Sequence, residues 1–263
     1  MSIMAGYKAF LSEDSSISVD HILLDPSESH HLSRVLRAKV GATVQVLDGE
    51  GGLYQTKVTQ IAPKAVELSI LAKSVNKRPS PELYLVIAVL KPKAMDQVLK
   101  RSVEIGVSRI LPVLTEYGSF SLDSNQSLIK QSKWRTTLIE ACKQSGNLFL
   151  PELSKPCSLK NFFQNYQANR TEASQGFVAS TEAENSYLLE ALDKTKAGTD
   201  AVFFAVGPEG DFSPSEYRAF ASHGFISSRL GGSILRSETA VCYGLAVLDQ
   251  HLRCLDRNEE SGN

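Results

Sequence analysis

Two glycine-rich segments near the C-terminus contain the residue types expected of a ligand-binding site. The first, residues 205–216, reads AVGPEGDFSPSE, and the second, residues 230–240, reads LGGSILRSETA. Glycine lets a backbone approach a ligand closely and offer its N–H and C=O groups directly. Each segment alone is also compatible with an ordinary turn between a strand and a helix. Two such segments so close in sequence favour one pocket lined largely by main chain.

The second segment adds two ionisable side chains, Arg236 and Glu238. A cation at a reaction site stabilises a developing anion, and a carboxylate accepts a proton. The same residues could instead form an ion pair at the start of a helix, with Ser237 or Thr239 as its cap. Both interpretations remain open from the sequence.

The class of ligand is restricted by the motifs that the segments do not contain. Neither the GxxxxGK[ST] phosphate loop nor the GxGxxG dinucleotide motif occurs. Glu209 in the first segment would repel a triphosphate, whereas it suits a hydroxyl or a cationic group. A neutral or cationic adenosine ligand is therefore the coherent candidate, and S-adenosylmethionine, with its flat adenine and its sulfonium, fits it.

Short apolar runs precede both glycine segments and predict the strands that position them. Residues 201–206 (AVFFAV) precede the first segment and residues 225–230 (FISSRL) the second. Strands and helices alternate from residue 83 onward, which predicts an α/β fold with a parallel sheet. In such sheets ligands bind beyond the carboxyl ends of the strands. Further strands are expected at 83–90, 109–114 and 177–179, and helices at 95–105, 128–145, 187–193, 213–222 and 239–254. The polar stretch 161–176 is expected to be irregular surface.

The first 75 residues predict a separate, small β-rich unit with one helix, and the polar stretch 73–82 predicts a linker. Short strands with tight turns favour a barrel. The helix should begin at Asp25-Pro26-Ser27-Glu28, with Leu32, Val35 and Leu36 on one face. On another face, the i, i+4, i+7 spacing places His30, Arg34 and Arg37 together. These side chains could hold phosphates or form a solvated face.

Composition sets broader limits. The 263 residues are 42% hydrophobic and 22% charged, with a net charge of −1, so no overall basic footprint marks a nucleic-acid binder. Four cysteines lack zinc-site spacing, no metal site is expected, and isolated thiols favour a cytoplasmic protein. No apolar run approaches the roughly 20 residues of a membrane span.

Five segments in order resemble one bacterial family. They are HHLSRVLR followed by GATVQVLDGEGG, the run KPKAMDQVLKRSVEIGVSRILPVLTE, IEACKQSG, GPEGDFSPSE and LGGSILRSETA. Together they resemble the ribosomal RNA small subunit methyltransferase E family of the SPOUT superfamily, which methylates N3 of a uridine in 16S ribosomal RNA. The resemblance implies a PUA-like β-barrel over residues 1–75 and a methyltransferase domain with a trefoil knot over residues 82–258. It also implies S-adenosyl-L-methionine as cofactor, 16S rRNA or the assembled small subunit as partner, and a homodimer.

Site residues follow from the same resemblance. For the implied activity, Arg236 is the candidate catalytic cation and Glu238 a candidate base, unless the two form a structural pair. His30, Arg34, Arg37 and Arg101 are the candidates for RNA binding. Cofactor contacts carry over to Val206, Gly207, Pro208, Glu209, Gly210, Leu230, Gly231, Ile234, Leu235, Ser237 and Thr239. Family members commonly have Gly where Asp211 stands, and Arg where Asn147 and Ser233 stand. Two rival functions remain: an RNA-binding module without catalysis, and an enzyme with another target nucleotide.

Overall fold

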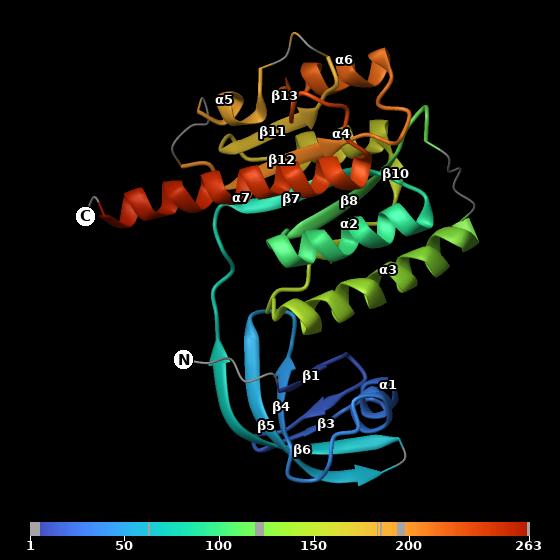
Figure 1. Ribbon diagram of the computed structural model, residues 1–263, viewed down its shortest axis with the longest axis vertical. Helices are drawn as coiled ribbons and strands as arrows, with labels where there is room; N and C mark the ends of the chain where they lie inside the picture. Colours follow the sequence, from blue (N-terminus) through green and yellow to red (C-terminus); the bar gives the residue numbers. More distant parts are fainter. Residues whose placement is uncertain are drawn as a thin grey trace. The chain divides into compact units, whose positions relative to one another are not determined.

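The computed structural model describes residues 6–62, 64–118, 124–182, 184, 186–193 and 198–261 (Figure 1). Contacts divide the chain into two compact units. The first comprises Met1–Arg78 and Ile139–Leu150, and the second comprises Pro79–Leu138 and Pro151–Asn263. The boundary at Arg78 lies inside the expected linker, whereas the return of residues 139–150 to the first unit is not visible in the sequence.

The first unit is built on a six-stranded sheet. Its strands are β1 (Tyr7–Phe10), β2 (Ser16–Ile17), β3 (His21–Leu23), β4 (Thr43–Leu47), β5 (Gly52–Ala62) and β6 (Ala65–Val75). The strand order is β1-β4-β5-β6-β3-β2, in which only the β1–β4 pair is parallel. Alternate residues of β4 and β5, such as Val44, Val46 and Val58, are buried in one apolar core. The β-rich character predicted for this unit is confirmed.

The helix of the first unit begins where the sequence predicts. The Asp25 side chain accepts hydrogen bonds from Ser27 N (2.7 Å) and Glu28 N (3.1 Å), which caps α1 (Pro26–His30). Burial acts to raise the pKa of Asp25. Hydrogen bonds from Ser12, Ser15 and these two amides outweigh that effect, so the pKa is lowered.

The regular helix predicted beyond α1 is wrong. The chain continues as a π-helical turn, η1 (His31–Val35), and Arg37 has a positive φ of 56°. A π turn contains more residues than an α turn, so positions i, i+4 and i+7 no longer share a face. Accordingly Leu32 is buried, but Val35 is 59% exposed.

A buried ion pair ties residues 139–150 into the first unit. Lys143 Nζ lies 2.6 Å from Glu28 Oε1, and the two side chains are 6% and 11% exposed. The other Glu28 oxygen accepts a hydrogen bond from Phe10 N, and Glu140 Oε1 lies 2.7 Å from Lys143 Nζ. Removing one partner of such a pair leaves a buried charge uncompensated.

The second unit contains a parallel sheet, as predicted, and the described sheet has seven strands. Its strands are β7 (Glu82–Ala88), β8 (Arg109–Leu114), β9 (Glu152–Leu153), β10 (Cys157–Ser158), β11 (Ser174–Ala179), β12 (Ala201–Val206) and β13 (Phe225–Ser228). The order is β10-β8-β7-β12-β11-β13, and β9 pairs with β8. Every residue of β12 is buried because helices cover both faces of the sheet.

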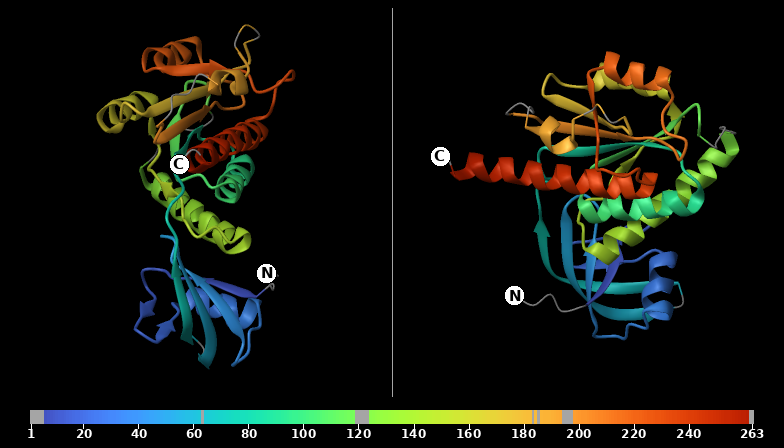
Figure 2. Two further views of the ribbon diagram at one scale, coloured as in Figure 1. Left: turned by 90° about the vertical axis from the view of Figure 1, so that its left-hand side faces the viewer. Right: turned by 45° about the horizontal axis from the view of Figure 1, so that its top comes forward.

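Helices α2 (Pro92–Ile105) and α7 (Ser237–Ser261) cover one face, and α4 (Leu159–Asn169) and α6 (Pro214–Ser222) cover the other (Figure 2). The remaining helices are α3 (Ser124–Ser145) and α5 (Leu188–Leu192). Gly244 lets α7 lie directly on β12, because a Cβ there would approach the Phe204 ring to 2.2 Å. Within the described residues, no helix has the length and apolar character needed to cross a membrane.

The irregular surface predicted for residues 161–176 is wrong. Helix α4 occupies most of this stretch, and Phe162, Phe163 and Tyr166 are buried on one side of it. These rings pack with Phe220 of α6 and Phe225 of β13. The helix is therefore held by an aromatic core, although polar residues separate its apolar positions.

Candidate functional site

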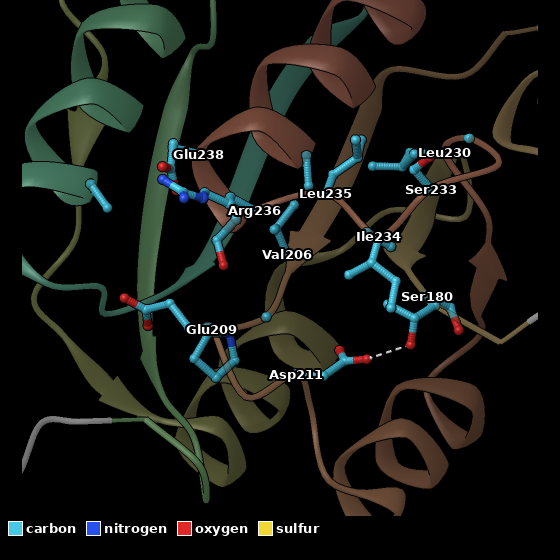
Figure 3. Close-up of a pocket in the computed structure, with 18 of the residues that line it drawn as sticks. Ser180, Val206, Glu209, Asp211, Leu230, Ser233, Ile234, Leu235, Arg236 and Glu238 are labelled. Atoms are coloured by element: carbon cyan, nitrogen blue, oxygen red, sulfur yellow. Dashed lines mark hydrogen bonds between the residues drawn. The ribbon is translucent and has the colours of Figure 1, made fainter.

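A cavity of about 790 Å³ lies beyond the carboxyl ends of neighbouring strands in the second unit. Its lining comes from residues 91–97 after β7, 206–211 after β12, 179–181 at the end of β11, and 229–240 after β13. Figure 3 labels residues from the last three of these segments. These four strands are adjacent in the order β7-β12-β11-β13. The cavity therefore occupies the position at which open parallel sheets bind ligands.

The first glycine segment forms a tight turn at the end of β12. The Asp211 amide donates to the Pro208 carbonyl at 2.9 Å, which closes the turn. A Cβ on Gly207 would lie 3.1 Å from Phe212 N, so a larger residue would press on the chain just beyond the turn. Glu209, at the tip of this turn, is exposed to the cavity.

Asp211 holds this turn to two other elements. Its carboxylate accepts hydrogen bonds from Thr181 Oγ1 (2.9 Å), Tyr217 OH (2.7 Å) and Phe212 N (2.7 Å). Burial is the main cause that raises the pKa of Tyr217, and the Asp211 charge raises it further, so Tyr217 remains a donor at neutral pH. Asp211 has a positive φ of 64°, a conformation that favours glycine. This explains why family members commonly have glycine at this position.

The second glycine segment forms the apolar wall. Leu230 and Leu235 are half-buried, and Ile234 is 84% exposed although it is a large aliphatic residue. Cβ atoms on Gly231 and Gly232 would meet nothing within 4 Å. This segment therefore offers open apolar surface to a ligand (Figure 3).

Arg236 and Glu238 lie where the second segment enters α7, on the side of the cavity opposite Asp211 (Figure 3). The Arg236 carbonyl accepts from the amides of Thr239 and Ala240, so its main chain starts the helix. Among the described residues, the Arg236 and Glu238 side chains form no ion pair with each other. The alternative of an ion pair at the helix start is therefore not observed, and both charges face the cavity.

Most of the residues expected to contact a cofactor line this cavity. They are Val206, Gly207, Pro208, Glu209, Leu230, Gly231, Ile234, Leu235 and Ser237. The two other residues expected to contact a cofactor, Gly210 and Thr239, lie outside this lining. A Cβ on Gly210 would lie 3.1 Å from Tyr117 Cβ, so this glycine faces the β8 side, and Thr239 is exposed on the first turn of α7.

Sequence reasoning missed one wall, which comes from the start of α2. Lys91, Lys93, Ala94 and Gln97 line the cavity there, and both lysines are exposed. In the described part of the chain, neither lysine side chain has an ion-pair or hydrogen-bond partner. Farther along α2, by contrast, Lys100 pairs with Asp96 at 2.7 Å. Among the described residues, the Lys100 cation is therefore paired with a carboxylate away from the cavity, whereas the Lys91 and Lys93 cations beside the cavity are not.

The residues expected to bind RNA occur in both units. His30, Arg34 and Arg37 are exposed in the first unit, but η1 and the positive φ of Arg37 break the helical face that was expected to align them. Arg34 lines a smaller cavity of about 250 Å³. Arg101, in the second unit, pairs with Glu104 at 2.5 Å, which offsets its charge.

Comparison with known proteins identifies the family. The family profile described as RNA methyltransferase domain matches residues 76–249, which include every segment that lines the larger cavity. The chain belongs to the RNA methyltransferase family. A second profile, RNA methyltransferase PUA domain, matches residues 24–71 of this methyltransferase. The resemblance inferred from the five sequence segments is thus confirmed, and so is the assignment of an enzyme class.

Individual relatives agree in sequence and fold. Ribosomal RNA small subunit methyltransferase E of Synechocystis sp. is 27% identical over 248 residues, covering 94% of this methyltransferase and 78% of that protein. The protein of that name from Neisseria gonorrhoeae, crystallised with S-adenosyl methionine, has a TM-score of 0.81 at 24% identity, covering 93% and 97% of the two chains. A Legionella pneumophila methyltransferase in complex with bound SAM has a TM-score of 0.81 at 25% identity, covering 94% and 98%.

Proposed function

We propose that this chain transfers a methyl group from S-adenosyl-L-methionine to N3 of a uridine in 16S ribosomal RNA. The observation that carries the proposal is the cavity formed by the two glycine segments at the carboxyl ends of adjacent strands, in a chain of the RNA methyltransferase family. The names of its relatives support the rRNA substrate, and the SAM-bound neighbours support the cofactor.

The cavity wall fits this cofactor. Exposed aliphatic surface at Ile234, with Leu230 and Leu235 beside it, suits a flat adenine. The tight main chain at Gly207 leaves backbone groups open to a ligand, and the charge of Glu209 is compatible with a sulfonium. We propose cofactor contacts for the nine expected residues that line the cavity, and none for Gly210 or Thr239.

Chemistry at N3 of uracil requires an accessible base and the loss of a proton. N3 lies on the Watson–Crick edge, so the base must be unpaired or flipped out of a helix. When bound, S-adenosylmethionine supplies the methyl group, and the electron pair of the broken C–S bond stays on sulfur. N3 forms the new bond with its own electron pair after its proton leaves to Glu238 or to water. Arg236 stabilises the negative charge that develops on the uracil oxygens.

The cationic wall of the cavity suits the RNA backbone. Lys91 and Lys93 are unneutralised beside the cavity, and each neutralised phosphate contributes favourably to RNA affinity. We propose that they bind phosphates next to the target base. His30, Arg34 and Arg37 in the first unit are proposed to contact the RNA backbone elsewhere, and Arg101 to contribute once it leaves Glu104.

We further propose the architecture that the family resemblance implies. It comprises a closed PUA-like barrel over residues 1–75, a methyltransferase domain over residues 82–258 with a trefoil knot at the cofactor site, and a homodimer. The four cysteines are free thiols, which supports a cytoplasmic location, where the 16S rRNA or the assembled small subunit would be the partner.

Two measurements test the function. Calorimetry should detect S-adenosylmethionine binding to the purified protein, and the absence of binding at millimolar cofactor would favour an RNA-binding module without catalysis. Mass spectrometry of ribosomal RNA from cells lacking the protein should show the loss of one N3-methyluridine. Loss of a methyl group from another nucleotide would support a methyltransferase that acts on that nucleotide instead of on N3 of a uridine.

A further inference from the structure

Asp211 adopts a backbone conformation that side chains rarely tolerate. Its φ of 64° lies in the left-handed region, which favours glycine. An aspartate in this conformation persists only when the surrounding structure stabilises it, and such residues cluster at ligand sites. The reason for an aspartate at this position must therefore be sought in its carboxylate.

The carboxylate is fixed from three directions. Three groups donate hydrogen bonds to it: the hydroxyl of Thr181, a residue just after β11; the hydroxyl of Tyr217 in α6; and the backbone amide of Phe212, the next residue of the turn. A carboxylate has about four acceptor positions, so one remains available after these three hydrogen bonds. The side chain is half-buried, and its orientation is set by the protein rather than by solvent.

The fixed charge belongs to the cavity wall. Both Asp211 and Thr181 line the cavity. In the described part of the chain, no lysine or arginine forms an ion pair with Asp211. The guanidinium of Arg229, also on the wall, lies over the Tyr187 ring at 4.8 Å, and Arg236 is on the other side of the cavity (Figure 3). Among the described residues, the Asp211 carboxylate is therefore an anion of the wall that no cation contacts directly.

We propose that Asp211 makes the site prefer the cationic S-adenosylmethionine to its neutral demethylated product. This inference rests on the proposed function. Cofactor and product share every group except one methyl, whose loss converts a sulfonium cation into a neutral thioether. A fixed anion on the wall stabilises the bound sulfonium but not the bound thioether. Because the product then binds less tightly than the cofactor, Asp211 also limits product inhibition. A residue that only shaped the turn would affect both ligands equally.

The ratio of the two dissociation constants tests the inference without any turnover. Calorimetry should compare S-adenosylmethionine and S-adenosylhomocysteine on the wild type, on Asp211→Asn and on Tyr217→Phe. In Asp211→Asn the affinity for S-adenosylmethionine should fall about fivefold, the upper range for a partly exposed charge pair, and that for the product by less than about twofold. Tyr217→Phe removes a donor but keeps the charge, so it should weaken both ligands alike.

The matched control is Asp200→Asn. Asp200 also accepts a hydroxyl hydrogen bond, from Thr171 Oγ1 at 2.7 Å, but lies outside the cavity lining, so its variant should leave both affinities unchanged. Equal weakening of both ligands by Asp211→Asn, or no weakening, would overturn the inference alone. A wild type that binds no S-adenosylmethionine would overturn the proposed function as well.

A second measurement uses only the wild-type protein and so tests the inference even if the Asp211→Asn variant does not fold. Salt screens a charge interaction but not a shape preference, so the wild-type preference for S-adenosylmethionine should decline severalfold between 50 and 500 mM salt. A preference that is independent of salt would contradict the role of the charge.

Discussion

Loss of the two cavity lysines should weaken RNA binding and reduce the salt dependence of the RNA affinity. Lys91 and Lys93 line the cavity without an ion-pair partner among the described residues, so both charges are available to phosphates. The proposed variant is the double substitution Lys91→Gln with Lys93→Gln. Neither substitution removes an intramolecular hydrogen bond that the structure describes, so folding should be unaffected.

The size of the effect follows from counterion release. For single-stranded nucleic acid the slope of log K against log salt is about −0.7 per neutralised phosphate, so two lost contacts reduce its magnitude by about 1.4. If the affinities of wild type and variant converge near 1 M salt, the same difference weakens binding about 14-fold at 0.15 M. Cofactor affinity should not change, because the glycine segments remain intact.

The assay is fluorescence anisotropy of a labelled rRNA fragment, titrated with protein between 50 and 300 mM salt. Lys100→Gln is the matched control, since Lys100 lies on the same helix but pairs with Asp96 and is outside the cavity lining. The control should retain nearly the wild-type slope. An unchanged slope in the double variant, or an equal change in the control, would refute the assignment of an RNA phosphate site to this wall.

Three further changes test the site and the first unit. Arg236→Ala should reduce methylation at least about 100-fold, with cofactor affinity within a few-fold of wild type by calorimetry; full activity would contradict a catalytic role. Lys143→Ala should lower the free energy of unfolding by about 3 kcal/mol in urea titrations, because the Glu28 carboxylate stays buried without its cation; a loss below about 1 kcal/mol would show that Glu28 finds other solvation. Asp25→Asn should flatten the acid limb of stability: the pKa of Asp25 is lowered from 3.8 on folding, so its contribution is present above about pH 4 and is lost as pH falls through the folded value. Equal acid sensitivity of variant and wild type would contradict this.

The strands around the site were predictable because a strand that is buried on both faces of a sheet consists of consecutive apolar residues. Strand β12 (Ala201–Val206) has the predicted bounds, and its six buried residues explain why no alternation was needed to recognise it. The capping box at Ser213 and Glu216 likewise predicted the start of α6. Where local chemistry determines an element, the sequence alone was sufficient.

Two elements were mispredicted for different physical reasons. Helix α4 has its apolar residues at the helical spacing i, i+3, i+4 and i+7, from Leu159 to Tyr166, so the signal was present but hidden among polar residues. The π turn η1 has no comparable signal. It widens one turn and is followed by a positive φ at Arg37, so a spacing argument based on 3.6 residues per turn could not hold.

The α2 wall could not be predicted because it depends on strand order. Lys91 follows β7, and Gly207 follows β12, more than a hundred residues later. Their segments meet only because β7 and β12 are neighbours in the sheet, paired from Glu82 and Ala201 onward. Hydrophobic patterns predict that strands exist but not which strands pair, so the wall from α2 was beyond sequence reasoning.

Strand order also explains how one cavity can serve two ligands of opposite charge. The segment after β7 contributes unneutralised lysines, and the segment after β12 contributes Asp211, whose carboxylate the protein holds in place. A methyl donor that carries a positive charge and an RNA that carries negative charges then have separate electrostatic partners. The two sets of variants should therefore act independently: Asp211→Asn should alter cofactor selectivity with RNA affinity unchanged, and the lysine double variant should do the reverse. Coupling between them would mean that the two ligands share a single electrostatic environment, which would contradict the division of the cavity into two walls.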